Sequence, residues 1–92
     1  MSTPAGEGEA RVLLYTRTGC HLCEGAREVV VQVASEAGAD WAEVDIDAGP
    51  EAPALQARYG EFVPVVLVDG VQQGQWRVDA DRLRRALARG SA

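Results

Sequence analysis

Short apolar runs alternate with amphipathic segments along the chain, and this alternation predicts where strands and helices lie. Residues 11–15 are almost continuously apolar, which is typical of a strand buried on both faces of a sheet. Residues 21–37 carry an apolar stripe at three- and four-residue spacing, which predicts an amphipathic helix that ends before Gly38. The stripe consists of Ala26, Val29, Val30, Val33 and Ala37. The patterned part of the chain therefore begins with a buried strand followed by a helix.

The same patterns predict five further elements in the rest of the chain. In order they are a strand over 41–46, a short helix over 53–59, a strand over 65–68, a strand over 71–77 and a helix over 80–89. Asp69-Gly70 is typical of a two-residue turn, so the last two strands should form a hairpin with 71–77 at the sheet edge. Asp79 is suited to cap the final helix.

This order of elements predicts an α/β fold built on one sheet. A strand–helix–strand unit needs parallel strands and a right-handed crossover, whereas the final hairpin adds an antiparallel pair. We therefore expect a four-stranded mixed sheet flanked by three helices, with helices on both faces. Residues 11–92 would form this single domain, and residues 1–10, which lack a periodic pattern, would form a flexible N-terminal tail.

Composition narrows the class of protein. The 92 residues carry 14 acidic and 9 basic side chains, a net charge of −5, which argues against a nucleic-acid or anionic-membrane binder. No apolar run approaches the roughly 20 residues that a membrane span needs, and the first ten residues do not resemble a secretory signal. We expect a cytoplasmic protein that is a monomer.

The two cysteines are the strongest chemical signal. Cys20 and Cys23 stand between the first predicted strand and the first predicted helix. A cysteine at a helix start faces free backbone N–H groups and the positive end of the helix dipole, which stabilise a thiolate. Cys20 would attack a disulfide, and Cys23, one turn along, would displace the captured group. His21 lies between them, and in its protonated form it would add to the stabilisation of the thiolate.

The cysteine pair has three other interpretations. Two buried, inert thiols would need no further partners. A zinc site requires four ligands, and one chain cannot supply them at this motif, so the metal would have to lie between two subunits. An iron–sulfur cluster between two subunits is the related alternative. A c-type haem site is excluded because Glu24 stands where the motif requires histidine. Trp41 and Trp76 are interpreted as packing residues, and the arginines of the last helix as a solvated face.

The order of elements, with Cys-x-x-Cys opening the first helix, resembles the thioredoxin fold and its glutaredoxin branch. The matching segments are Tyr15-Thr16-Arg17, Cys20-His21-Leu22-Cys23, Val44-Asp45-Ile46-Asp47, Phe62-Val63-Pro64 and Asp69-Gly70. The resemblance implies that the Val63-Pro64 bond is cis and faces the active cysteine, with the Val63 backbone free to pair with a substrate. It also implies that Arg17 holds a carboxylate of the substrate thiol.

Several positions depart from the pattern of that family. His21 and Leu22 replace the usual proline and aromatic residue between the cysteines, where they would contact the substrate. The stretch 73–79 lacks the usual Gly-Gly pair, and the loop over 60–63 is about one residue short. Arg58 is a further candidate for binding a substrate carboxylate. We therefore expect glutathione to bind poorly compared with typical glutaredoxins.

Together these features predict a thiol–disulfide oxidoreductase of glutaredoxin type without a tightly bound cofactor or metal. Its substrate would be a disulfide of a protein or of a small thiol. Electrons would come from a low-molecular-weight thiol, glutathione or another, or from a reductase protein. The alternative is a non-catalytic thioredoxin-fold module that uses the cysteine pair to bind metal or to sense redox state.

Overall fold

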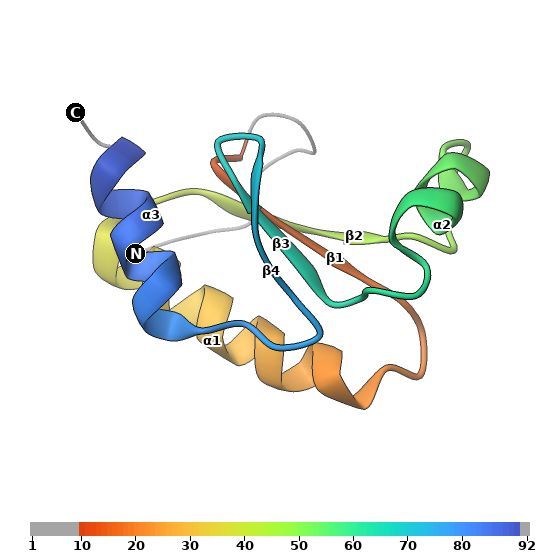
Figure 1. Ribbon diagram of the computed structural model, residues 1–92, viewed down its shortest axis with the longest axis horizontal. Coiled ribbons are helices and arrows are strands. Elements are labelled where there is room, and N and C mark those ends of the chain that lie inside the picture. The colour runs from red at the N-terminus through yellow and green to blue at the C-terminus, as the bar shows by residue number, and fades with distance from the viewer. Residues whose placement is uncertain (1–9, 91–92) are drawn as a thin grey trace.

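The computed structural model describes residues 10–90, drawn in colour in Figure 1. The elements are, in order, β1 Val12–Thr16, α1 His21–Ala37, β2 Trp41–Asp45, α2 Ala52–Tyr59, β3 Val65–Val68, β4 Val71–Gln75 and α3 Ala80–Gly90. The predicted order is confirmed, and most bounds agree with the prediction or differ from it by one residue. Strand β4 ends two residues earlier than predicted, because Trp76 adopts a positive φ of 63° and turns the chain. The predicted tail falls almost wholly outside the described residues.

The sheet has the predicted mixed topology. The strands lie in the order β2-β1-β3-β4, with β1 and β2 parallel and the other two pairs antiparallel. Leu14, in the central strand β1, lies between Glu43 of β2 and Val66 of β3. The pairing of β3 with β4 shifts register after Val66, so the edge strand carries an irregularity beside the segment that leads to α3.

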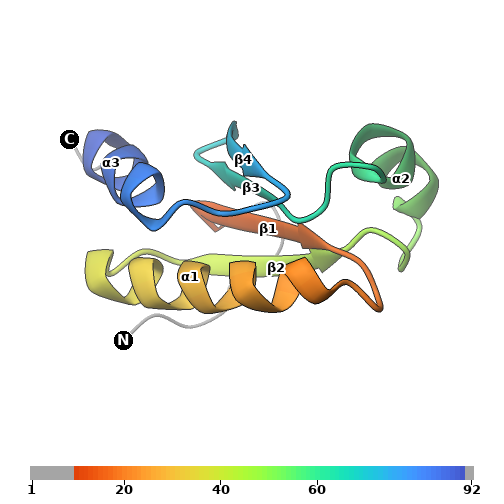
Figure 2. The ribbon, with the colours of Figure 1, turned by 60° about the horizontal axis from the view of Figure 1, so that its bottom comes forward.

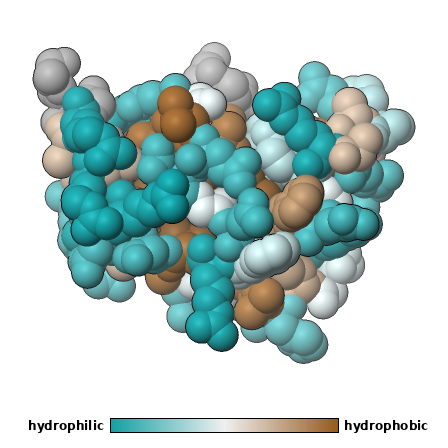
Figure 3. Space-filling model, viewed as in Figure 1, coloured by the Kyte–Doolittle hydropathy of each residue, from teal (hydrophilic) through white to brown (hydrophobic). Residues whose placement is uncertain are grey.

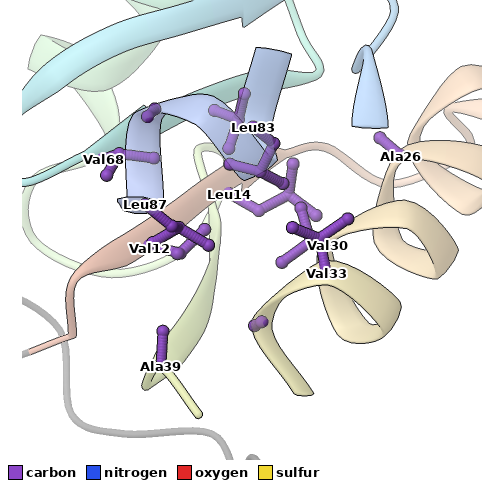
Figure 4. Packing of buried hydrophobic residues seen from close by; sticks show 12 residues of the cluster. Val12, Leu14, Ala26, Val30, Val33, Ala39, Val68, Leu83 and Leu87 are labelled. Carbon is purple, nitrogen blue, oxygen red and sulfur yellow. The ribbon is translucent and has the colours of Figure 1, made fainter. Parts of the chain in front are cut away.

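Helices α1 and α3 cover the same face of the sheet, as Figure 2 shows. Successive residues of a strand point to opposite faces, so Val12 and Leu14 of β1 point toward these helices. In Figure 4, Leu14 lies close to Val30 of α1 and Leu83 of α3 within the buried core. The face of α1 that was predicted from its spacing is thus the buried one, although Val29 and Ala37 are less covered than the rest.

The opposite face of the sheet is covered at one end by the short helix α2. Tyr59, its last residue, stacks on Tyr15 of β1 with ring centroids 4.6 Å apart. Val65 pairs with Tyr15 and therefore shares this face, where it is fully buried. Helices thus lie on both faces, and α2 anchors the chain just before the cis peptide bond between Val63 and Pro64.

Two helix ends follow the predicted signals. Gly38 ends α1 in the left-handed conformation with a φ of 65°. Asp79 precedes α3, and its carboxylate accepts hydrogen bonds from the backbone N–H groups of Asp81 and Arg82. Within residues 10–90 no helix combines the length and apolar character needed to cross a membrane.

Candidate active site

The two cysteines lie at the start of α1, where β1 delivers the chain through a four-residue loop. Gly19 takes a φ of 80° in that loop, a conformation that glycine adopts without strain. Cys20 is the N-cap residue of α1, and the backbone N–H of Cys23 donates to its Sγ at 3.1 Å. The two residues form a disulfide with their Cα atoms 5.3 Å apart. The sulfur of Cys20 thus takes the place of the oxygen that usually caps a helix.

The two sulfurs differ in their exposure. Cys23 is buried, with 2% of its surface exposed, whereas Cys20 is partly open to solvent. His21 and Leu22, between them in sequence, are both exposed. An incoming disulfide would therefore meet Cys20 first, and the backbone N–H that reaches Cys20 would stabilise negative charge on its sulfur.

A polar pocket of about 290 Å³ lies on the β2 side of the pair, and both cysteines line it. Its lining includes an ion pair, in which Nε and Nη2 of Arg27 donate to the carboxylate of Glu43 at 2.5 and 2.8 Å. The buried hydroxyl of Thr16 donates to the same carboxylate at 2.9 Å. The hydrogen bonds from Arg27, together with the one from Thr16, hold the pKa of Glu43 below its usual range despite partial burial.

Sequence reasoning did not identify this ion pair. Arg27 and Glu43 are 16 residues apart, and only the packing of α1 across β2 brings them together. The alternation of polar Glu43 with buried Ala42 and Val44 was a usable signal, since it places the carboxylate on the opposite face from those two residues.

Arg17 also lines this pocket, but its side chain is engaged elsewhere. Its guanidinium donates twice to the carboxylate of Asp47, at 2.9 and 3.1 Å, and once to the backbone carbonyl of Gly60 at 3.1 Å. Gln56 of α2 donates to the same carboxylate at 2.7 Å. The hydrogen bonds from Arg17 lower the pKa of Asp47 below its usual range. Arg17 therefore ties the loop before Cys20 to the end of β2 and to α2.

The segment around Val63-Pro64 differs in one respect from the expectation. The peptide bond between these residues is cis, and Pro64 is fully buried. The backbone N–H of Val63, however, donates to the carbonyl of Tyr59 at 3.1 Å. The expectation that the Val63 backbone is free to pair with a substrate is thus wrong for its N–H, because the end of α2 already occupies that donor.

A second hollow, of about 320 Å³, lies on the other side of the cysteine motif, between α1 and the segment after β4. In Figures 1 and 2 this segment runs along the N-terminal part of α1. Leu22 and Trp76 line the hollow and are 52% and 50% exposed. Trp41 packs against the core as expected, whereas Trp76 lies outside the core and packs against the exposed ring of Phe62.

The remaining predicted site residues are placed as follows. His21 lines both hollows, so it marks the ridge between them. Arg58 lies on α2 with its guanidinium carbon 5.4 Å from the centroid of the Tyr59 ring, and it lines neither hollow. Among residues 10–90, no group of three or more histidine, cysteine or acidic side chains is arranged to hold a metal ion.

Comparisons with known proteins agree with this geometry. The sequence profile of the family described as Glutaredoxin-like domain (DUF836) matches residues 11–88. An uncharacterized protein of Mycobacterium tuberculosis (strain H37Rv) is 40% identical over 81 residues, covering 86% of this chain and 84% of that protein. A structural-genomics target from X. campestris superposes with a TM-score of 0.65 at 39% identity, covering 85% of this chain and 96% of the other. The holo form of glutaredoxin C1 from Populus tremula x tremuloides shares the fold, with a TM-score of 0.61 at 24% identity over 90% and 80% of the two chains.

Proposed function

The chain belongs to the glutaredoxin-like domain family, and we propose that it is a thiol–disulfide oxidoreductase acting through Cys20 and Cys23. Its substrates would be mixed disulfides of proteins or of low-molecular-weight thiols. The observation that carries this proposal is the position of Cys20 as helix N-cap, with the backbone N–H of Cys23 donating to its sulfur at 3.1 Å. This arrangement stabilises the thiolate form, which is the nucleophile in disulfide exchange.

The difference in exposure supports an order in which Cys20 reacts first and Cys23 second. The partly exposed Cys20 thiolate attacks one sulfur of the substrate disulfide, and the other sulfur leaves as a thiolate that takes up a proton. Cys23 then loses its proton and attacks the Cys20 sulfur, which breaks the mixed disulfide and releases the second substrate thiol. Two electrons pass from the cysteine pair to the substrate, and the protein is left with the Cys20–Cys23 disulfide.

A complete cycle needs a reductant that restores both thiols. Two equivalents of a low-molecular-weight thiol, or a dithiol of a reductase protein, would supply the two electrons. The engaged side chain of Arg17 and the engaged N–H of Val63 support a donor other than glutathione. Neither a resident metal nor a tightly bound cofactor has a part in these steps.

The decisive experiment compares the pre-reduced protein with its Cys20→Ser and Cys23→Ser variants in one turnover. A small neutral mixed disulfide is the substrate, and the products are separated by mass spectrometry. The proposal expects the native protein to release the substrate thiol, Cys23→Ser to accumulate a mixed disulfide at Cys20, and Cys20→Ser to be inert. Absence of reaction with the native protein, accompanied by metal in preparations made without chelator, would favour the non-catalytic binding module.

A further inference from the structure

Exposed apolar side chains gather on one side of the cysteine motif. Among the described residues five large apolar side chains are exposed, and three of them are connected with the hollow beside α1. Leu22 and Trp76 line it, and the ring of Phe62 lies 6.1 Å from that of Trp76. We call this hollow and the Phe62 ring at its rim the apolar groove. The other two exposed residues, Val31 and Val71, line neither hollow beside the cysteine motif.

The aromatic wall of the apolar groove is held in place before any partner arrives. The backbone N–H of Trp76 donates to the carbonyls of Phe62 and Pro64, at 3.2 and 2.9 Å. Its indole N–H donates to the carbonyl of Glu61 at 2.9 Å. The indole is thus oriented by hydrogen bonds although half of the residue is exposed. An aromatic surface that is already ordered loses little conformational entropy when it binds.

The charge around the groove restricts what can occupy it. His21 and Arg77 are the ionisable residues that line the groove, and no carboxylate lines it. Within residues 10–90, Arg77 forms no ion pair. The chain as a whole carries a net charge of −5, so this lack of acidic groups is local. The groove therefore favours an apolar ligand with acidic neighbours and gives no partner to a basic one.

A small thiol bearing two carboxylates fits this site poorly. Three donors of Arg17 are already bonded to Asp47 and Gly60, and Arg58 lies on α2 against Tyr59. The carboxylates of a charged tripeptide such as glutathione would therefore find these two arginines engaged, and only Arg77 and His21 of the groove would remain for them. An extended protein segment would instead gain from burying an apolar side chain against Leu22 and Trp76.

We propose that the apolar groove selects the substrate: an extended protein segment whose disulfide-bonded cysteine is flanked by an apolar residue. This inference rests on the proposed oxidoreductase activity. As Cys20 attacks the cysteine sulfur, the neighbouring apolar side chain enters the groove between Leu22 and Trp76. The segment's acidic residues lie near Arg77. The electron balance is that of the proposed function, with two electrons passing to the target disulfide and its two sulfurs leaving as thiols.

The test uses two short peptides, each carrying one cysteine as a mixed disulfide with 2-mercaptoethanol. The first has leucine and phenylalanine on either side of its cysteine, and the second has serine and glycine. The second-order rate constant is measured in a single turnover with the pre-reduced protein, so no external reductant is needed. We expect the apolar peptide to react about tenfold faster, which corresponds to one well-packed side chain. Glutathione mixed disulfide with 2-mercaptoethanol should react no faster than the polar peptide.

Variants of the groove make the test specific. Trp76→Ala and Leu22→Ser should each bring the ratio of the two rate constants close to one, whereas Val31→Ala and Val71→Ala should leave it unchanged. Leu22→Ser changes only an exposed helix residue, so it serves if Trp76→Ala fails to fold. Two further versions of the apolar peptide carry either a glutamate or a lysine at the end away from the cysteine. The glutamate version should react faster than the lysine version, and Arg77→Gln should remove that difference.

The outcomes separate this inference from the proposed function. Equal rates for the two peptides, retention of the preference in both groove variants, or a faster reaction with the glutathione disulfide would overturn the groove as the selecting surface. Each of those results would leave the oxidoreductase activity itself established. If neither peptide nor the glutathione disulfide reacts, the proposed function fails, and the inference fails with it.

Discussion

The two sides of the cysteine pair differ in polarity. On the β2 side, Arg27 and Thr16 both donate hydrogen bonds to Glu43, so the three side chains that line the polar pocket here have partners. On the other side, Leu22 and Trp76 border the apolar groove with exposed apolar surface. Figure 3 shows that, on the face it presents, apolar atoms lie in separate areas among hydrophilic ones. The difference teaches that hydrogen-bonded polar groups tie α1 to β2 on one side, whereas the other side leaves apolar surface exposed, which is the surface that the proposed substrate segment would cover.

This division has a physical reason. The attacking sulfur needs a fixed position relative to the N–H groups at the helix start, because a small displacement weakens those hydrogen bonds. The ion pair between Arg27 and Glu43 links α1 to β2 on this side of the cysteine pair. A surface that binds substrates, as proposed for the apolar groove, must instead bind and release different segments. Apolar contacts allow this because they have no fixed direction.

The largest expected effect comes from removing the Cys20 sulfur, which lies between the polar pocket and the apolar groove in the proposed reaction. Cys20→Ser should abolish thiol exchange, and Cys23→Ser should retain the attack. Iodoacetamide should label Cys20 before Cys23 at about pH 6 to 7, because the helix start favours the Cys20 thiolate and burial keeps Cys23 protonated. Mass spectrometry of the reduced protein reads both sites. Equal labelling at the two cysteines would mean that the helix start does not activate Cys20.

The second-largest expected effect is a loss of stability at low pH, where the hydrogen-bonded carboxylates become protonated. Hydrogen bonds from arginine lower the pKa of Glu43, Asp47 and Asp69, so the folded protein binds fewer protons than the unfolded chain. Their stabilisation is full above the unfolded pKa values of about 4 and is lost as the pH falls through the lower folded values. The melting temperature should be level between about pH 7 and 5 and fall by a few degrees by about pH 3, since exposed ion pairs contribute little each.

Glu43→Gln tests the difference between the polar pocket and the apolar groove, because it weakens only the hydrogen bonds that line the polar pocket. The amide keeps the shape but removes the charge that Arg27 and Thr16 bond, so we expect a loss of about 1 kcal/mol at pH 7. The variant should also show a smaller drop in melting temperature below about pH 4. Glu36→Gln, which breaks the more exposed pair with Arg84, is the matched control and should cost less. The peptide preference of the apolar groove should not change in either variant.

The sequence was sufficient for the parts of the fold that depend on local pattern. The spacing of Val30 and Val33 located the buried face of α1, and Asp69-Gly70 located the hairpin turn. The cysteine pair was identified because two cysteines at this spacing before a helix have few other uses. The place of Trp76 outside the core was not predicted, because no periodic pattern marks the positive φ with which the chain turns directly after β4.

Other parts of the site depend on contacts between distant segments. The partner of Arg27 is set by how α1 crosses β2, and the partner of Arg17 is set by where β2 ends. From the sequence alone, several acidic residues were candidate partners for each arginine. Only the way in which the helices and strands pack selects one of them. The resemblance to glutaredoxins assigned Arg17 to a substrate carboxylate, whereas the structure bonds it to Asp47.

The smallest expected effect comes from replacing Arg17, which lines the polar pocket but is bonded outside it. Arg17 is partly exposed, so its pair with Asp47 is screened by water and contributes little to stability. Arg17→Ala should lower the melting temperature by no more than about 4 °C. If the side chain mainly fixes the loop before Cys20, the variant should slow reaction with both test peptides equally, and Arg17→Lys should not restore the rate, because lysine lacks the two-pronged geometry.

If Arg17 instead binds a substrate carboxylate, its removal should slow glutathione disulfide more than a neutral disulfide, and lysine should restore part of the rate. The pair of single-turnover rate constants for these two substrates, measured in native protein, Arg17→Ala and Arg17→Lys, distinguishes the roles. We expect equal slowing for both substrates, of about twofold to threefold, since the loop is also held by the cap at Cys20. A selective loss with the glutathione disulfide would move Arg17 from positioning the loop to binding the substrate.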